Sequence, residues 1–484
     1  MNRQKQSGQS LLLVLVLALI LGATLSFLYD NAQLLAERQK AKMLADQAAY
    51  ATGVRQARLM NLNAYINRAQ VANQLAIAQA VSMGSWTQFA ATLSGNIGTL
   101  TSWVPGVGTA FTAMGLVMTK VSDALGPYVT AYGQAVRALG FAQQALNTSS
   151  TLTILAAPTQ FRNSLNARDQ QDYQFDLSLV GSSLPASMIK RYEDAERQSM
   201  LEVVNESRQR VPFLSNRSKT LFKMSLVFLR VRVEKRGGAE LVGMAEWKSA
   251  DTLSLHLQTK GCGFLGSRWC GDRETPLGYG SAAVSQDGQD AAIKITPAEY
   301  ANVWVPVGFS DSKPSFTLKR IKTREASTEV YGDYGGSMAT NPAATQRSAQ
   351  QTVSWDVSNT SASTAGIGIP DYYDLRDTNA SDPIFPMTLI VRKDYSRLPV
   401  STQQPALQAK GSQARLDHFK AGDQMMALSR SEVYFQRPTE LEVLSTGWQH
   451  QNASLYSPYW KLRLSDSISI GDRGAAYAQV AVAK

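Results

Sequence analysis

The sequence has few of the side chains that carry most protein chemistry. Its 484 residues include two cysteines and three histidines, and His256, His418 and His450 lie far apart. None of these histidines has a second potential ligand at the spacing of a metal site. No constellation of nucleophile and base emerges from the sequence either. The sequence therefore predicts a protein that is not an enzyme and that holds no metal or other cofactor.

A strong excess of one charge is also lacking. The chain carries 48 Lys and Arg against 38 Asp and Glu, a formal net charge of +10 that is spread thinly. The densest basic run, residues 319–324, is too short and too poor in aromatic residues for a nucleic-acid groove. We therefore expect no nucleic-acid partner. The run is interpreted as a solvated strand face, with mild attraction to anionic lipid or cell-wall polymer as the alternative.

One long apolar run lies near the N-terminus. Residues 11–28, which begin with Leu11, Leu12 and Leu13 and end with Leu28, contain no charged side chain. As a helix rising about 1.5 Å per residue the run spans roughly 27 Å, close to the hydrocarbon thickness of a bilayer. We expect a transmembrane anchor, preceded by a basic leader over residues 1–10 that stays cytoplasmic. The alternative is a cleaved signal peptide, whose apolar region is normally shorter.

The region after the anchor, residues 29–146, contains no proline before Pro105 and no charged residue between Arg68 and Lys120. Ala, Gln, Leu and Asn dominate it, a composition that is mostly compatible with helix. We expect the anchor helix to continue through Ala51. The rest of the region should form helical pieces that are separated where proline and glycine occur together.

An uncharged stretch of this length must bury its surface in the fold, in a partner or at the membrane. Its Ala, Gly and Ser residues allow helix backbones to approach closely, which favours association with membrane proteins or with a second copy of the chain. Trp86, Phe89 and Trp103 are the candidate partner-binding residues. Two alternatives stay open for the stretch: a packed helical hairpin whose surface is neutral, and a second membrane span over residues 103–118. For the three aromatic residues, the alternative is a position in the core.

Residues 147–484 have the pattern of a β-rich domain. Apolar residues alternate over residues 227–233, as in a half-buried strand. Residues 236–239 predict a turn that returns the chain as a hairpin. The other predicted elements are an amphipathic helix over residues 187–210 and strands over residues 383–391, 433–436 and 460–464. The predicted fold class is α+β, with a transmembrane helix extending into a helical region and then a β-rich α+β domain outside the cytoplasm.

The two cysteines agree with export to an oxidising compartment. Cys262 and Cys270 lie close together in a glycine-containing segment, and we predict that they close a small loop as a disulfide. Two free thiols are the alternative. Zinc is a poor third choice, because the chain has neither a second Cys pair nor a His between the two.

The residues around the anchor resemble a known family. A short basic leader with Gln6-Ser7-Gly8-Gln9 precedes the apolar helix, and the segments 44–51 (LADQAAYA) and 63–76 (NAYINRAQVANQLA) follow it. This order of parts resembles TadE/TadG-like proteins of the tight-adherence (Flp) pilus and related secretion systems of bacteria. Segments similar to the larger members of the group are found at residues 247–254, 274–280, 432–438 and 457–464.

The resemblance implies a membrane-anchored structural or assembly component of a Flp (Tad) type IV pilus or a related secretion system. It implies a single pass through the bacterial inner membrane, with the N-terminus cytoplasmic and the bulk of the chain periplasmic. The implied partners are other pilus-assembly or secretion membrane proteins, together with membrane lipid. The alternative is a minor pseudopilin or an adhesin that is exposed on the pilus.

The sequence departs from two relatives of that group. Prepilins are cut after a glycine such as Gly8 and usually carry Glu five residues later, where this chain has Leu13. The segment around Asp356 lacks the apolar strand that precedes the metal-binding loop of a von Willebrand A-type domain. A minor further alternative is an envelope hydrolase built on Ser337, although its Gly-x-Ser-x-Ala setting lacks the usual strand and helix.

Overall fold

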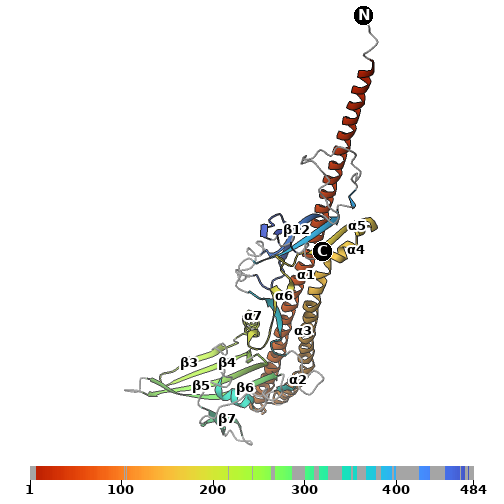
Figure 1. Ribbon diagram of the computed structural model, residues 1–484. Helices are drawn as coiled ribbons and strands as arrows, with labels where there is room; N and C mark the ends of the chain where they lie inside the picture. The colour runs from red at the N-terminus through yellow and green to blue at the C-terminus, as the bar shows by residue number, and fades with distance from the viewer. Residues whose placement is uncertain are drawn as a thin grey trace. The chain divides into compact units, whose positions relative to one another are not determined.

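The computed structural model describes most of the chain (Figure 1). The described residues are 7–102, 104, 106–215, 217–242, 244–262, 268–285, 300–309, 316–324, 341–349, 353–356, 367–377, 383–394, 397–398, 424–436, 453–468, 470–471, 473–474 and 478. They confirm the predicted class at the level of secondary structure: the fold is α+β, with a long N-terminal helix that begins apolar and a β-rich C-terminal region.

The helices are concentrated in the first half of the described chain. They are α1 (Ser7–Leu100), α2 (Val107–Asp123), α3 (Gly126–Leu155), α4 (Ala157–Asn163), α5 (Ala167–Asp172), α6 (Pro185–Met188), α7 (Gln198–Gln209) and α8 (Pro342–Ala349), with a 3-10 helix at Asp194–Arg197.

The strands follow α5. They are β1 (Tyr173–Leu177), β2 (Ile189–Tyr192), β3 (Lys219–Ser225), β4 (Leu229–Val242), β5 (Glu246–Cys262), β6 (Arg268–Ser285), β7 (Tyr300–Phe309), β8 (Phe316–Arg324), β9 (Val353–Asp356), β10 (Tyr372–Leu375), β11 (Ile384–Asp394), β12 (Gln424–Phe435) and β13 (Trp460–Ser465).

Helix α1 confirms that the apolar run continues as helix through Ala51 and extends the prediction to 94 residues. No proline interrupts the sequence before Pro105, so the backbone ladder is not broken. The next helix begins after Gly106, whose φ of 83° is the left-handed conformation that glycine adopts without strain. Helix α3 begins at Gly126, so the predicted breaks near Pro105 and Gly126 are both confirmed.

The chain folds into two compact units, and α1 contributes to both. The first unit comprises Met1–Tyr65, Gln144–Lys190 and Asp374–Lys484; the second comprises Ile66–Gln143 and Arg191–Tyr373. This partition differs from the predicted regions 29–146 and 147–484, because each unit combines part of the helical region with part of the β-rich region.

The first unit is built on the antiparallel sheet β1-β11-β12-β13. Its last three strands confirm those predicted over residues 383–391, 433–436 and 460–464. Small residues of α1, including Ala45 and Ala48, are fully buried. A Cβ added at Gly53 would lie 2.5 Å from the Leu462 side chain. The alanines and Gly53 therefore allow the helix to lie directly on the sheet.

The second unit is built on the five-stranded sheet β3-β4-β5-β6-β9, in which only β9 pairs in parallel fashion. Figure 1 shows β3 to β6 lying side by side as long strands. A Cβ added at Gly280 on β6 would lie 2.2 Å from the backbone nitrogen of Phe89 and 2.3 Å from the carbonyl oxygen of Ser85 on α1. Sheet and helix therefore touch through their backbones at this point.

The hairpin turn predicted at residues 236–239 is wrong. Strand β4 runs straight through Gly237 and Gly238 to Val242, and both glycines pair with β5. A Cβ at Gly237 would lie 2.4 Å from the carbonyl oxygen of Ala250. The glycine thus serves a close approach between strands rather than a turn, which is the other use of glycine in sheets.

The amphipathic helix predicted over residues 187–210 is only partly right. Helix α7 accounts for its C-terminal half, whereas Ile189–Tyr192 forms strand β2 and pairs with β10. Between them, Asp194 adopts a φ of 47°. A left-handed residue interrupts a right-handed helix, so the pattern could not continue as one element.

Buried amide side chains fix the register of α1 within each unit. In the first unit, Asn63 and Asn147 donate to each other's side-chain oxygens at 3.1 and 2.8 Å. In the second unit, Gln74 donates to the Gly368 carbonyl at 2.6 Å and accepts from the indole nitrogen of Trp247 at 2.9 Å. A buried amide is favourable only with its partners in place, so these contacts specify which turn of α1 lies where.

Candidate functional site

The apolar start of α1 is an extended hydrophobic surface that is exposed in the folded chain. Leu11 is 71% exposed and Leu28 is 58% exposed, and Leu12 and Leu13 are similar. The most apolar 18-residue window of the helix has a mean hydropathy of 2.9 and no buried residue. Among the described residues this is the one helix long and apolar enough to cross a bilayer. Its length and composition are compatible with the predicted single-pass anchor.

A partly buried cluster of charges joins α1 to the sheet of the first unit just beyond this segment. The Glu37 carboxylate accepts hydrogen bonds from the Tyr173 hydroxyl at 2.5 Å and from the Lys393 ammonium at 2.9 Å. Lys393 also lies 3.4 Å from Asp172, and its ammonium sits 4.8 Å from the centre of the Tyr173 ring. The cluster therefore links α1, α5, β1 and β11.

The proton distribution in this cluster follows from its partners. Burial by itself would raise the pKa of Glu37, but the hydrogen bonds from Tyr173 and Lys393 and the charge of Lys393 hold it below its usual value. Burial, then the hydrogen bond to Glu37, raises the pKa of Tyr173. Glu37 is thus the ionised acceptor and Tyr173 the neutral donor at neutral pH.

We expect Lys393→Met to lower the free energy of unfolding by about 2 kcal/mol, because it removes the buried ammonium that pairs with both Glu37 and Asp172, while Lys40 remains near Glu37. The matched control is Lys40→Met. Lys40 lies 2.5 Å from Asp169, but its side chain is 39% exposed, so its loss should cost about 1 kcal/mol or less. Hydrogen exchange of peptides from β1 and β11 measures the stability of the first unit in both variants. Equal effects would contradict the assigned role of Lys393.

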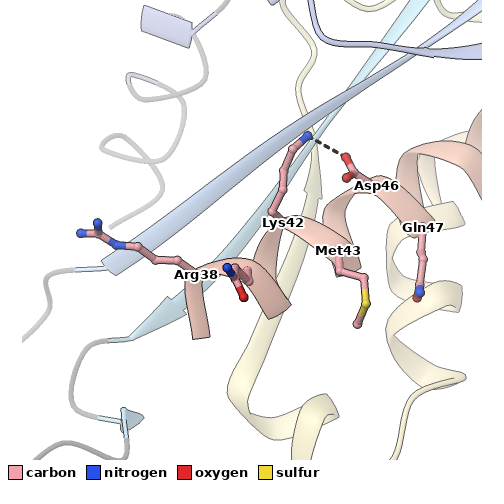
Figure 2. Close-up of a pocket in the computed structure, with 6 residues that line it drawn as sticks. Arg38, Lys42, Met43, Asp46 and Gln47 are labelled. Carbon is pink, nitrogen blue, oxygen red and sulfur yellow. Dashed lines mark hydrogen bonds and ion pairs between the residues drawn. The ribbon is translucent and has the colours of Figure 1, made fainter. Parts of the chain in front are cut away.

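The neighbouring solvent face of α1 has a shallow hollow, shown in Figure 2. Its lining residues all come from α1 and are Arg38, Gln39, Lys42, Met43, Asp46 and Gln47. Lys42 and Asp46 pair at 2.6 Å, the dashed line in Figure 2. Asp46 also accepts from the Ser429 hydroxyl at 2.6 Å, and Lys42 donates to the Leu428 carbonyl at 3.2 Å. Both charges are used to hold the helix on β12.

A second exposed apolar surface lies on α2 in the second unit. We call it the α2 face, and its residues are Leu116, Val117, Lys120, Val121 and Ala124. The opposite side of α2 packs on α1 through glycine: a Cβ at Gly115 would lie 3.1 Å from the Ala91 carbonyl. Helices α1 and α2 therefore pack on each other, as in the hairpin that was one of the alternatives for the uncharged stretch. This packing leaves the apolar side chains of the α2 face toward solvent. The surface was not predicted from the sequence.

The aromatic residues predicted as partner contacts have different environments. Phe89 is 7% exposed, and it lies against Gly278 and Gly280 of β6 with the Lys235 ammonium 5.0 Å from its ring centre. Its ring therefore lies in the core, which was the alternative to a partner contact. Trp86 is half-buried. Trp103 lies outside the described residues, so its predicted role stays a prediction.

Other predicted features also fall outside the described part of the chain. The side chains of Cys262 and Cys270 are not described, although their backbones lie on the paired strands β5 and β6. Ser337 lies outside the described residues, and so do the side chain of Asp356 and the side chains of residues 319–324. The disulfide therefore remains a prediction from the sequence.

Within the described residues, no group of three or more His, Cys, Asp and Glu side chains is arranged to hold a metal ion. In comparisons with known proteins, the chain matches no family model, no curated protein and no solved structure. A function is therefore inferred from the fold, the apolar start of α1 and the α2 face.

The one described histidine belongs to a polar network in the second unit. His256 on β5 faces two acceptors, with Nδ1 3.2 Å from Asp272 and Nε2 3.2 Å from the side-chain oxygen of Asn341. The amide of Asn341 is oriented by a 2.9 Å hydrogen bond from its nitrogen to the Glu234 carbonyl. Two acceptors require two donors, so the imidazolium form fits this site.

The pH dependence of stability follows from this geometry. Burial alone would lower the pKa of His256, but the hydrogen bond and charge of Asp272 and the charge of Glu274 raise it above its usual value. Asp272 also pairs with Arg232 at 2.9 Å. A raised pKa adds stability that is complete below the unfolded-state pKa and is lost as the pH rises through the folded-state pKa.

We therefore expect the second unit to be less stable at about pH 8.5 than at about pH 6 through this group. Replacing the histidine by His256→Gln should flatten this slope. Hydrogen exchange of peptides from β5 and α8 at the two pH values measures this pH dependence in the wild type and in the variant. An unchanged slope in the variant would show that His256 does not titrate as the network requires.

Proposed function

We propose that the chain is a single-pass membrane protein that serves as a structural or assembly component of a Flp-type pilus or a related secretion system. The observation that carries the proposal is the contrast along α1. Residues of its apolar start are exposed in the folded chain, whereas Ala45, Ala48 and later small residues are buried in the fold. An apolar surface of this kind that the fold leaves uncovered requires another cover, and a bilayer provides it.

The resemblance to TadE/TadG-like proteins supplies the biological setting of the proposal. The segment 63–76, which carries much of that resemblance, has a structural role. Its buried amides Asn63, Asn67 and Gln74 bind defined groups elsewhere in their own units. Residues of this kind specify a fold, which suits a protein that acts through the shape of its surfaces.

The proposed mode of action is protein–protein contact outside the cytoplasm. The N-terminal leader would lie in the cytoplasm, because Arg3 and Lys5 precede the span. The α2 face would contact another membrane protein of the same assembly. Large apolar side chains at such a surface are the usual source of binding energy once water is excluded.

The proposal is tested by locating the chain in cells that make the pilus. An assembly component is expected in inner-membrane fractions and absent from sheared filaments. Recovery of the chain in sheared filaments would instead support the alternative, a minor pseudopilin or a pilus-borne adhesin. Recovery in the cytosol would contradict both.

A double substitution tests the α2 face. We expect Leu116→Asp with Val117→Asp to remove the chain from a larger complex in native gels of mildly solubilised membranes, because charge opposes burial at an interface. The fold should be kept, since both side chains are more than half exposed. Gln134→Asp with Ala138→Asp, at two exposed positions of α3, is the charge control. Retention of the complex in the double variant would exclude this face as the contact.

A further inference from the structure

Strand β3 is an exposed edge of the sheet in the second unit. It lies at the end of the strand order β3-β4-β5-β6-β9, and β4 is its one neighbour among the described residues. All seven of its residues are exposed. An edge strand presents unpaired backbone N–H and C=O groups, which other chains can use as a template for pairing.

The side chains of this edge are unusually apolar. Leu221 and Phe222 are about half exposed, and Phe228 at the tip of the hairpin is 73% exposed. The tip is closed by a 2.7 Å hydrogen bond from the Leu226 nitrogen to the Leu229 carbonyl. We call residues 219–228 the β3 edge. An exposed apolar patch on an unpaired edge marks an interaction surface.

The two faces of the hairpin differ in chemistry. Phe222 pairs with Val233 and Met224 pairs with Val231, so these four apolar residues share one face. Between these pairs, Lys223 pairs with Arg232 on the opposite face. No ion pair to another described residue holds Lys223, while Arg232 contacts Asp272 and Glu234. The edge thus offers an apolar face and a face with a free lysine.

We propose that the β3 edge binds an extended segment of another protein, added as a further strand, in which acidic and apolar residues alternate. Backbone hydrogen bonds supply the affinity in this mode, and alternate side chains supply the specificity. The apolar residues of the segment lie beside Phe222 and Met224, and a carboxylate lies beside Lys223. Opposite charges across a strand pair are favourable.

Charge and backbone chemistry disfavour two other occupants of the edge, a second copy of the chain and a bilayer. A second copy of the chain would bring its own Lys219 and Lys223 to the same edge, and like charges across a strand pair are destabilising. A bilayer would leave the backbone groups of the edge without hydrogen-bond partners, at a cost of several kcal/mol each in hydrocarbon. An acidic strand satisfies both the charges and the backbone.

This inference deepens the proposed function and rests on it, because the assembly supplies the partner protein. The test uses the full chain in neutral detergent and a fluorescent peptide of about eight residues that alternates Glu and Val, the length of an ordinary strand. We expect saturable binding by fluorescence anisotropy that weakens as salt is added. The same peptide with alternate N-methylated residues should not bind, because it cannot form the ladder.

The variant Lys223→Glu is expected to weaken binding about tenfold or more through charge repulsion. Lys461→Glu changes the net charge equally at an exposed position of β13 and should bind like the wild type. Absence of binding, equal binding of the N-methylated peptide or of a Lys–Val peptide, or unchanged binding by Lys223→Glu would each overturn the inference. Membrane fractionation and the α2 face experiment do not involve β3, so they separate this failure from failure of the proposed function.

Discussion

Gly280→Ala is expected to disrupt the second unit, with a loss of about 3 kcal/mol or more in its free energy of unfolding. The added Cβ would lie 2.2 Å from the Phe89 nitrogen and 2.3 Å from the Ser85 carbonyl oxygen. Both are backbone atoms of α1, so a change of side-chain rotamer cannot relieve the overlap. Helix and sheet must separate, and the buried contacts around Phe89 are lost with them.

The control is Gly95→Ala on α1, the helix that Gly280 contacts. A Cβ at Gly95 meets no atom within 4 Å, and alanine is favoured over glycine inside a helix by up to about 1 kcal/mol. Hydrogen exchange of peptides from β5 and β6 should be much faster in Gly280→Ala and unchanged or slower in Gly95→Ala. Similar exchange in the two variants would contradict the backbone contact between α1 and β6.

The second large effect is expected in the anchor. Leu17→Arg with Ile20→Arg places two cations in the middle of the apolar run, at about 2.5 to 3.5 kcal/mol each on insertion scales. We expect the variant to be lost from carbonate-washed membranes. Both positions are more than half exposed in the folded chain, so the fold itself gives no reason for destabilisation.

The control for this variant lies on the same helix outside the apolar run. Met43→Arg with Gln47→Arg adds the same charge at two exposed positions of α1, and it should leave the chain in the membrane. If the Leu17 and Ile20 variant remained in washed membranes as fully as the control, residues 11–28 would not be the anchor.

Local patterns predicted the elements that depend on neighbouring residues. The absence of proline predicted that the anchor helix continues through Ala51, and α1 extends it to Leu100. Alternation over residues 227–233 predicted the start of β4, and strand-like composition predicted β11 and β13. Gly237 was misinterpreted because a strand glycine that permits close approach to Ala250 has the same local sequence as a turn glycine. Asp194 was missed because a positive φ at a non-glycine residue has no clear sequence signal.

Only the part of the candidate site that is built from neighbouring residues in the sequence was predicted. Leu11, Leu12, Leu13 and Leu28 form an apolar run that any reading of the sequence finds. Glu37 and Lys393 are 356 residues apart, and a single sequence contains no indication that they meet. The α2 face is apolar at helical spacing, a pattern that was visible but is shared by most buried helices.

The most direct test of the central claim is to determine the N-terminus and intact mass of the chain recovered from carbonate-washed membranes. We predict that the chain is found in the membrane pellet and that it retains residues 11–28, whether or not cleavage occurs after Gly8. A chain found in the soluble fraction that begins after residue 28 would contradict the claim, because the apolar run would then be a removed signal peptide.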